Sequence, residues 1–151
     1  MIEGVEVKQL VKHADERGFL MELLRSDDPI FRKFGQAYVS MNYPGVVRAW
    51  HWHRKQDDHF VAVKGMIKVA LYDGREGSPT RGRIDEFFLG EHNPLLVRVP
   101  PEVQHGWKCV GLDEAYIVNA PTEVYRYDDP DQDELPHDTD QIPYDWGVRL
   151  R

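Results

Sequence analysis

Short strand-like runs separated by turn residues are the feature that most constrains how this chain folds. Between turns rich in glycine, proline and aspartate, β-branched and aromatic residues gather in six runs, at residues 35–42, 59–65, 66–73, 85–90, 94–100 and 114–121. In the run at 66–73, Ile67, Val69 and Leu71 occupy alternate positions. We expect these three to point inward while the residues between them point outward. Many short strands of this kind favour an all-β sandwich or barrel.

Two segments fall outside the strand pattern. Residues 28–35, "DPIFRKFG", are the helix candidate, with Asp28 as the N-cap and Pro29 as the first helical residue. From residue 122 the chain is polar and acidic, until "IPYDWG" at 142–147 returns apolar side chains. We therefore expect a short helix, and a C-terminal tail that lies over the barrel and docks through Ile142, Tyr144 and Trp146.

Length and charge limit the function classes. A chain of 151 residues suits a single domain over residues 1–151. The formal net charge of -7 would repel nucleic acid and anionic membranes, so we expect neither as a partner. No run reaches the ~18 apolar residues of a membrane span, and the charged first residues do not resemble a signal peptide. The single cysteine, Cys109, excludes an internal disulfide, and we expect a cytoplasmic protein.

Histidines and an aspartate recur with a spacing that suits a metal or catalytic site. His51 and His53 are two residues apart, so on a strand both imidazoles face the same side. Asp58 begins the next strand-like run, and His105 follows the Pro-Pro turn in "VPPEVQHGW". If these four converge inside a barrel, they would suit Fe, Mn, Ni or Zn. A His-x-His pair taken alone is equally compatible with ordinary surface or core histidines.

The spacing resembles the two motifs of the cupin superfamily. Residues 45–65 are similar to the first motif, in which a glutamate usually stands at the position of Asp58. Residues 100–109 match the second motif in part, because Glu102 stands at a glycine of that motif and Cys109 at its asparagine. This resemblance implies a cupin jelly-roll barrel.

A narrower resemblance covers most of the chain. Gln36 and Ser40 fall where the dTDP-4-dehydrorhamnose 3,5-epimerase family, itself a cupin fold, has glutamine and serine, and Tyr38 stands at its asparagine. The resemblance implies a homodimeric barrel that opens onto a nucleotide-linked 4-keto sugar. Five further blocks are similar to segments of that family, in the expected order: "DERGFLME" (15–22), "GVVRAWHWH" (45–53), "SPTRG" (78–82), "GEHNPLLVRVPPEVQHGW" (90–107) and "IPYDW" (142–146).

The resemblance also implies residue roles. His51 would be the base that removes a proton beside the ketone, and a tail carboxylate would orient it, with Asp138 the first candidate and Asp140 the second. A neutral imidazole near pH 7 suits a base, and arginine suits a diphosphate. The implied function is epimerisation or isomerisation of a nucleoside-diphosphate 4-keto-6-deoxy sugar, as in dTDP-rhamnose and polysaccharide biosynthesis, with no cofactor. The sugar nucleotide would be bound by Arg17, Glu22, Gln36, Arg48 and His105.

Three positions depart from that family and keep two other functions open. Asp58 stands where the family has a lysine, Val118 where its catalytic tyrosine falls, and His53 where it has a glutamine. The first alternative is a non-catalytic sugar-binding cupin, because the lysine and the tyrosine are missing. The second is a metal-dependent cupin enzyme that binds a divalent transition metal through His51, His53, Asp58 and His105.

Overall fold

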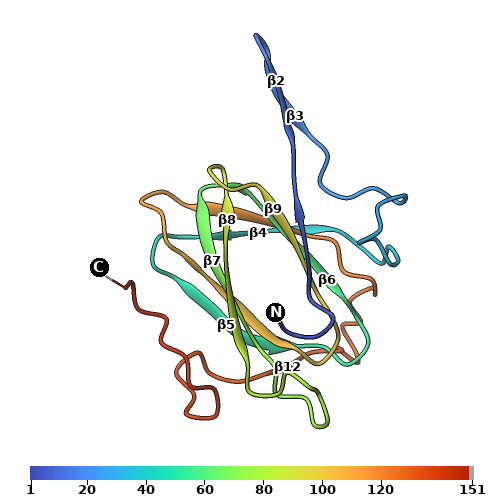
Figure 1. The fold of residues 1–151 in the computed structure, drawn as a ribbon, viewed down its shortest axis with the longest axis vertical. Helices are drawn as coiled ribbons and strands as arrows, with labels where there is room; N and C mark the ends of the chain where they lie inside the picture. Colours follow the sequence, from blue (N-terminus) through green and yellow to red (C-terminus); the bar gives the residue numbers. More distant parts are fainter. Residues whose placement is uncertain (150–151) are drawn as a thin grey trace.

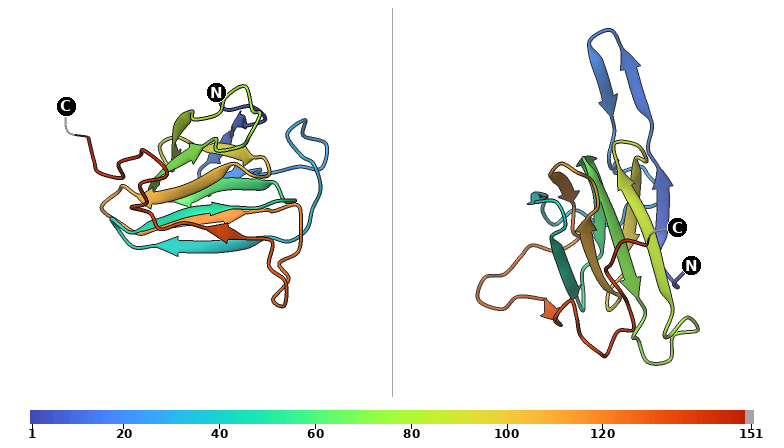
Figure 2. Two further views of the ribbon diagram at one scale, coloured as in Figure 1. Left: turned by 90° about the horizontal axis from the view of Figure 1, so that it is seen from below. Right: turned by 90° about the vertical axis from the view of Figure 1, so that its left-hand side faces the viewer.

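Two antiparallel sheets form the body of the protein in a computed structural model that describes residues 1–149 (Figure 1, Figure 2). The first sheet has the order β1-β9-β6-β11-β4, with the strands Glu6–Gln9, Leu95–Val99, Asp58–Lys64, Ala115–Asn119 and Tyr38–Asn42. The second has the order β12-β5-β10-β7-β8, with the strands Asp133–Glu134, Val47–Trp52, Gln104–Cys109, Met66–Tyr72 and Ile84–Gly90. The architecture is the expected all-β jelly roll.

The main hydrophobic core includes the inward side of β7. Ile67, Val69 and Leu71 are fully buried, as their alternation predicts. They belong to one cluster with Phe60 of β6 and Val97 of β9, which come from the other sheet. Burying a side chain of this size contributes about 1.5–3 kcal/mol. The core therefore holds the two sheets in a fixed relation, and the site described below lies between them.

The C-terminal tail covers the outer face of the second sheet. Ile142, Tyr144 and Trp146 pack there with Trp50 of β5 and Ala70 of β7, so the expected docking is confirmed. Trp50 is fully buried, and its ring centroid lies 5.6 Å from that of Tyr144 and 5.1 Å from that of Trp146. The outward side of the sheet thus forms a second buried layer.

The predicted helix at residues 28–35 is wrong. These residues form a turn followed by an extended segment, and residues 1–149 contain no helix, hence none able to cross a membrane. The Asp28 carboxylate accepts hydrogen bonds from Lys8 Nζ at 2.6 Å and from the Arg25 backbone N at 2.9 Å. Eight residues are too few for a helix to be stable by itself. The burial of Ile30 decides the conformation instead, in a small cluster with Leu10, Val61 and Leu96.

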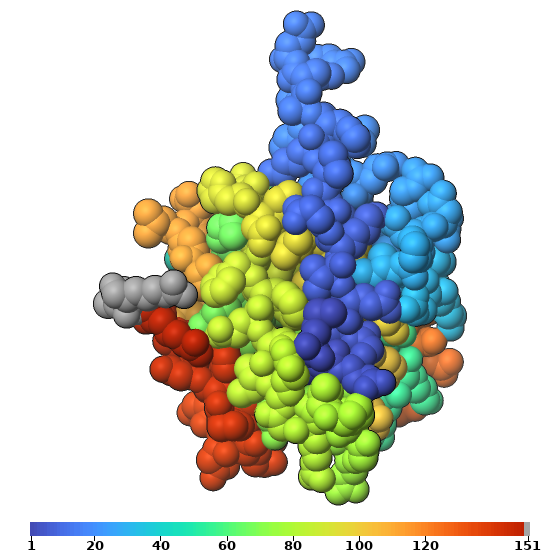
Figure 3. Space-filling view, viewed as in Figure 1, coloured from blue at the N-terminus to red at the C-terminus, as the bar shows by residue number. Residues whose placement is uncertain are grey.

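A two-stranded hairpin stands apart from the two sheets. Its strands, β2 (Lys12–Asp15) and β3 (Gly18–Met21), project from one end of the body, as Figure 3 shows. The side chains of Phe19 and Leu20 are 57% and 63% exposed. A lone hairpin is at best marginally stable in water. The hairpin therefore presents apolar surface that the described part of the same chain leaves uncovered.

Candidate active site

A pocket of about 240 Å³ lies between the two sheets. Strands β4 and β6 of the first sheet and β5 and β10 of the second contribute to its wall. Its lining combines imidazole, guanidinium and hydroxyl groups with the aromatic rings of Tyr38, Phe60 and Trp107, a composition typical of a site for a polar ligand. The lining residues are Tyr38, Ser40, Arg48, His51, His53, Phe60, His105, Trp107 and Gln132.

A bulge in β5 brings Arg48 and His51 to the same side of the strand. The two residues are three positions apart, so on a regular strand they would face opposite ways. In the pairing of β10 with β5, His105 lies opposite His51 and Trp107 lies opposite Arg48. Gly106 alone therefore faces two residues of β5, which defines the bulge. As a result both Arg48 and His51 line the pocket.

Gly106 is required for this bulge. The two residues opposite it are Ala49 and Trp50, whose side chains pack on the outer face of the sheet. A Cβ atom at Gly106 would lie 2.3 Å from the Cβ of Ala49 and 2.8 Å from the carbonyl oxygen of Arg48. Only a residue without a side chain allows β10 to approach β5 this closely.

His51 is partly withdrawn from solvent, with 27% of its side chain exposed. Its Nδ1 lies 3.8 Å from Oε2 of Glu134, which β12 places opposite His51 in the sheet. Desolvation lowers the pKa of His51, and the negative charge of Glu134 acts in the opposite direction. The imidazole is therefore neutral near pH 7 and can accept a proton.

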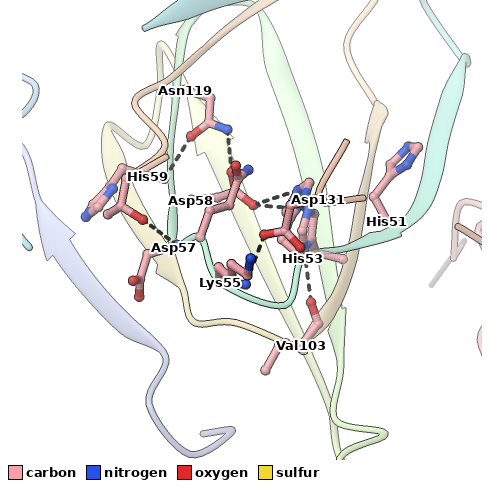
Figure 4. Close-up of polar contacts among 12 residues, drawn as sticks. His51, His53, Lys55, Asp57, Asp58, His59, Val103, Asn119 and Asp131 are labelled. Atoms are coloured by element: carbon pink, nitrogen blue, oxygen red, sulfur yellow. Dashed lines mark hydrogen bonds and ion pairs between the residues drawn. The ribbon is translucent and has the colours of Figure 1, made fainter. Parts of the chain in front are cut away.

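His53, Asp58 and His105 form a buried cluster beside the pocket, here called the His–Asp–His cluster (Figure 4). The three groups offer ligand atoms that all lie within 4.8 Å of one another. Nε2 of His53 and Nε2 of His105 are each 3.4 Å from Oδ2 of Asp58. Burial lowers the pKa of His105 to about 4.

Of the four residues predicted as a metal set, the structure groups His53, Asp58 and His105, and His51 stands outside this cluster. Its ring centroid is 6.5 Å from that of His105, and Figure 4 shows its ring apart from Asp58. His51 and the cluster thus form two distinct chemical groups on the wall of one pocket.

Asn42 anchors the arginine of the pocket. The Asn42 side chain is buried at the end of β4, and its Oδ1 accepts a hydrogen bond from Nε of Arg48 at 2.8 Å. The same oxygen accepts a hydrogen bond from Nε1 of Trp107 at 3.2 Å. These contacts fix the guanidinium on the pocket wall, where it offers positive charge to an anionic or carbonyl oxygen.

Comparison with known proteins identifies the family. A family model described as dTDP-4-dehydrorhamnose 3,5-epimerase matches residues 1–151. The chain belongs to the dTDP-4-dehydrorhamnose 3,5-epimerase family. It is accordingly a carbohydrate epimerase, and the metal-dependent and non-catalytic alternatives are not favoured.

Proteins from several organisms are similar to this epimerase in sequence or structure. It is 48% identical over 151 residues to the probable low-salt glycan biosynthesis epimerase Agl13 of Haloferax volcanii, covering 99% of this chain and 97% of that protein. It is 43% identical to the spore coat polysaccharide biosynthesis protein SpsL of Bacillus subtilis, with both chains covered completely (100%). The crystal structure of a dTDP sugar isomerase from Desulfovibrio desulfuricans superposes with a TM-score of 0.93 at 36% identity, covering 99% and 95% of the chains.

A solved structure of an epimerase whose sugar class is stated is also similar to this protein. NovW, a 4-keto-6-deoxy sugar epimerase from Streptomyces spheroides, superposes on this epimerase with a TM-score of 0.86 at 25% identity. The superposition covers 97% of this chain and 76% of NovW. The cupin-type jelly roll expected from the sequence is therefore shared with solved epimerases.

Asp138, the carboxylate expected to orient His51, lies elsewhere in this epimerase. After Glu134 the chain turns at Pro136 and crosses the outer face of the second sheet. The second candidate, Asp140, is exposed. Among residues 1–149, the one carboxylate within 4 Å of a His51 nitrogen is that of Glu134. Asp138 instead lines a separate hollow with Lys108, Tyr144 and Trp146.

Three predicted substrate contacts are absent from the pocket lining of the described chain. Arg17, at the tip of the hairpin, pairs with Asp15 at 2.5 Å. Glu22 pairs with a nearby arginine, and the Oε1 atom of Gln36 accepts a hydrogen bond from the backbone N of Tyr125 at 3.1 Å. Their proposed roles therefore remain predictions. Arg48 and His105 do line the pocket.

Several pocket residues were not among the predicted site residues. Tyr38 and Ser40 stand two apart on a predicted strand, so their alternation with Gln36 was a usable signal for a shared face. Gln132, which lines the pocket, and Glu134, which lies beside His51, come from the acidic tail, where charge runs give no such signal. Only the pairing of β12 with β5 identifies Glu134 as the neighbour of His51.

Proposed function

We propose that this epimerase removes the proton beside the ketone of a nucleoside-diphosphate 4-keto-6-deoxy sugar, with His51 as the base. The observation that supports it most is the position of a neutral imidazole in the pocket, on the same wall as Arg48. A C–H group beside a ketone is weakly acidic, so the base must be held close and the enolate oxygen must be stabilised. The described activity of NovW supports the substrate class.

Glu134 assists the base by its charge. When the proton moves from carbon to His51, the electron pair of the broken bond moves to the ketone oxygen and the imidazole becomes a cation. The Glu134 carboxylate, 3.8 Å away, stabilises that cation. At this distance in a partly exposed site the effect is about 1 kcal/mol. We therefore assign to Glu134 the positioning role that the resemblance gave to Asp138.

We assign the opposing proton donor to Tyr38. Epimerisation requires that a proton return to the carbon from the other face of the sugar. Tyr38 lines the pocket from the first sheet, whereas His51 lies on the second. Desolvation and, secondarily, the charge of Asp58 raise the pKa of Tyr38, so its hydroxyl keeps a proton near pH 7. Tyr38 would thus supply the phenol that is missing at Val118.

A homodimer would bring the remaining predicted contacts into use. We propose that the hairpin of one chain lies against its partner, which would cover Phe19 and Leu20 and bring Arg17 to the partner's sugar nucleotide. Arginine forms paired hydrogen bonds with phosphate oxygens, so Arg17 and Arg48 together would hold the diphosphate. The proton transfers need no organic cofactor. We further propose a cytoplasmic, single-domain enzyme whose product enters polysaccharide biosynthesis, the process named for SpsL.

Exchange of substrate protons with solvent tests this function. The protein is incubated in D₂O with dTDP-4-keto-6-deoxyglucose, and NMR follows deuterium at C3 and C5. We expect incorporation at one or both carbons with the wild type, and none with His51→Asn, although this variant should still bind the sugar nucleotide. Tyr38→Phe should permit exchange but lose formation of the epimer. Binding without exchange by the wild type would instead establish a sugar-binding protein, and unchanged exchange in His51→Asn would exclude that residue as the base.

A further inference from the structure

The His–Asp–His cluster presents three electron-pair donors to one point. His53 follows β5, Asp58 begins β6 and His105 lies on β10, so three segments far apart in sequence contribute to it. All three residues are buried, with 9%, 1% and 3% of their surface exposed. The two histidine Nε2 atoms are each 3.4 Å from the same oxygen, Oδ2 of Asp58. Two ligand atoms that each lie about 2.1 Å from a tetrahedrally coordinated ion are separated by this same distance.

The hydrogen bonds of the two histidines direct both Nε2 atoms toward Asp58. Nδ1 of His53 lies 2.5 Å from the carbonyl oxygen of Asp131, and Nδ1 of His105 lies 3.0 Å from that of Val103. A carbonyl oxygen only accepts, so each Nδ1 carries a proton, and in its neutral form each ring turns the lone pair of Nε2 toward Asp58. Backbone carbonyls hold metal-ligating histidines in the same way.

The carboxylate of Asp58 is also held with one oxygen free. Its Oδ1 accepts hydrogen bonds from Gln56 Nε2 at 2.9 Å and from Asn119 Nδ2 at 2.7 Å. The amide of Asn119 is itself fixed, because its Oδ1 accepts a hydrogen bond from the backbone N of His59 at 2.8 Å. Oδ2 thus faces the Nε2 atoms of both imidazoles in a buried space. With both rings neutral, these three acceptors have no donor among them, and a bound cation would satisfy all three.

We propose that His53, Asp58 and His105 bind one divalent transition-metal ion. Two imidazoles and one carboxylate suit Zn²⁺, Mn²⁺ or Fe²⁺, whereas Mg²⁺ and Ca²⁺ prefer oxygen ligands alone. Three protein ligands leave coordination positions for further groups. In this proposal three residues bind the metal and His51 stays free to act as the base. The metal-dependent alternative instead uses His51 as a fourth ligand.

The position of the cluster suggests what the ion contributes. His53 and His105 line the same pocket as His51 and Arg48. Without a cation, the buried negative charge of Asp58 would oppose an enolate forming in that pocket. A bound divalent ion would reverse the sign of this local charge and stabilise the enolate oxygen. This consequence depends on the proposed function, but metal binding itself is measured without any sugar.

Metal titration tests the site directly. Protein freed of its affinity tag and of metal is titrated with Zn²⁺ and with Mn²⁺, with calorimetry to give stoichiometry and elemental analysis of the dialysed complex to confirm it. We expect one ion per chain, and a rise in Tm of about 5–10 °C when the free ion is at 100 times its Kd. The absence of stoichiometric binding and of any rise in Tm with both ions would overturn the proposal.

The variant Asp58→Asn tests whether the Asp58 carboxylate binds metal or only stabilises the fold. The asparagine retains an oxygen for Gln56 and Asn119 and supplies an N–H donor to one bare Nε2, so the metal-free variant should melt at or above the metal-free wild type. Metal affinity should fall at least about 100-fold. A structural role for Asp58 predicts the reverse: a lower Tm and an unchanged metal response.

His51→Asn and His105→Asn complete the test. His51 lines the pocket but stands outside the cluster, so its variant is a matched control and should bind metal as the wild type does. His105→Asn should lose binding together with Asp58→Asn. Wild-type affinity in Asp58→Asn, or loss of binding in His51→Asn, would overturn the three-residue site. Failure of the solvent-exchange experiment alone would leave the metal site standing.

Discussion

Replacing Gly106 by alanine tests whether the bulge in β5 builds the active site. The added methyl group would lie 2.3 Å from Ala49 Cβ and 2.8 Å from the Arg48 carbonyl oxygen, whereas ordinary van der Waals contact begins at 3.4 Å. To restore contact, β5 must move away from β10 by roughly 1 Å. Arg48 and His51 move with it, because both flank the bulge.

The expected losses follow from that displacement. Overpacking at a site of this kind lowers the free energy of unfolding by about 1–3 kcal/mol. Misplacing catalytic groups by roughly 1 Å lowers kcat/KM about 100-fold. Urea unfolding measures the first quantity, and the rate of epimer formation measures the second. The activity should therefore fall by far more than the fraction of unfolded protein explains.

Two companion variants make the test specific. In Gly111→Ala the same methyl group meets nothing closer than 3.7 Å, so stability should change by less than about 0.5 kcal/mol and activity should be retained. Adding Ala49→Gly to Gly106→Ala removes the contact at 2.3 Å but leaves those at 2.8 Å and 2.9 Å, so about tenfold of the lost activity should return. Full activity in Gly106→Ala, or no recovery in the double variant, would show that the bulge does not set the positions of Arg48 and His51.

Other contacts lead to three further predictions. Glu134→Gln should lower kcat about 3–10-fold with KM unchanged, measured by steady-state kinetics, because its charge stabilises the protonated His51; a loss above 100-fold would contradict this. Trp146→Ala should lower the free energy of unfolding in urea by about 3–5 kcal/mol, because the tail would lose its packing against Trp50; an unchanged midpoint would show that the tail does not dock there. Burial raises the pKa of Asp73, but hydrogen bonds from Arg75, Ser78 and Thr80 outweigh it and leave the pKa far below its usual range. Stability should therefore fall as pH drops below about 4, and Asp73→Asn should flatten that decline in acid titration; an unchanged slope would contradict this.

The parts of the fold that depend on local pattern are predictable from the sequence. The alternation of Ile67, Val69 and Leu71 is a property of one strand, and the structure buries all three. The apolar spacing of Tyr144 and Trp146 likewise indicates a docking segment. The short helix at residues 28–35 was wrong because its capping signals are local, whereas the burial of its isoleucine depends on strands elsewhere in the chain.

The candidate site is predictable only in part. The two-residue spacing of His51 and His53 predicts that both face one side, but it gives no hint that His53 joins a buried cluster with Asp58 and His105 while His51 lies beside Glu134. Gly106 lies far from the bulge in sequence, and its significance depends on the distance between two strands. Glu134 is one acid among many in the tail, so only the register of β12 against β5 distinguishes it from Asp138.

A crystal structure with a bound dTDP-linked 4-keto-6-deoxy sugar, grown from metal-loaded protein, tests most directly whether His51 is the base. The sugar should lie in the pocket between the sheets, with C3 or C5 about 3–3.5 Å from a nitrogen of the His51 imidazole. The ketone oxygen should face the His–Asp–His cluster. A sugar bound outside this pocket, or with its ring carbons out of reach of that imidazole, would exclude His51 as the base.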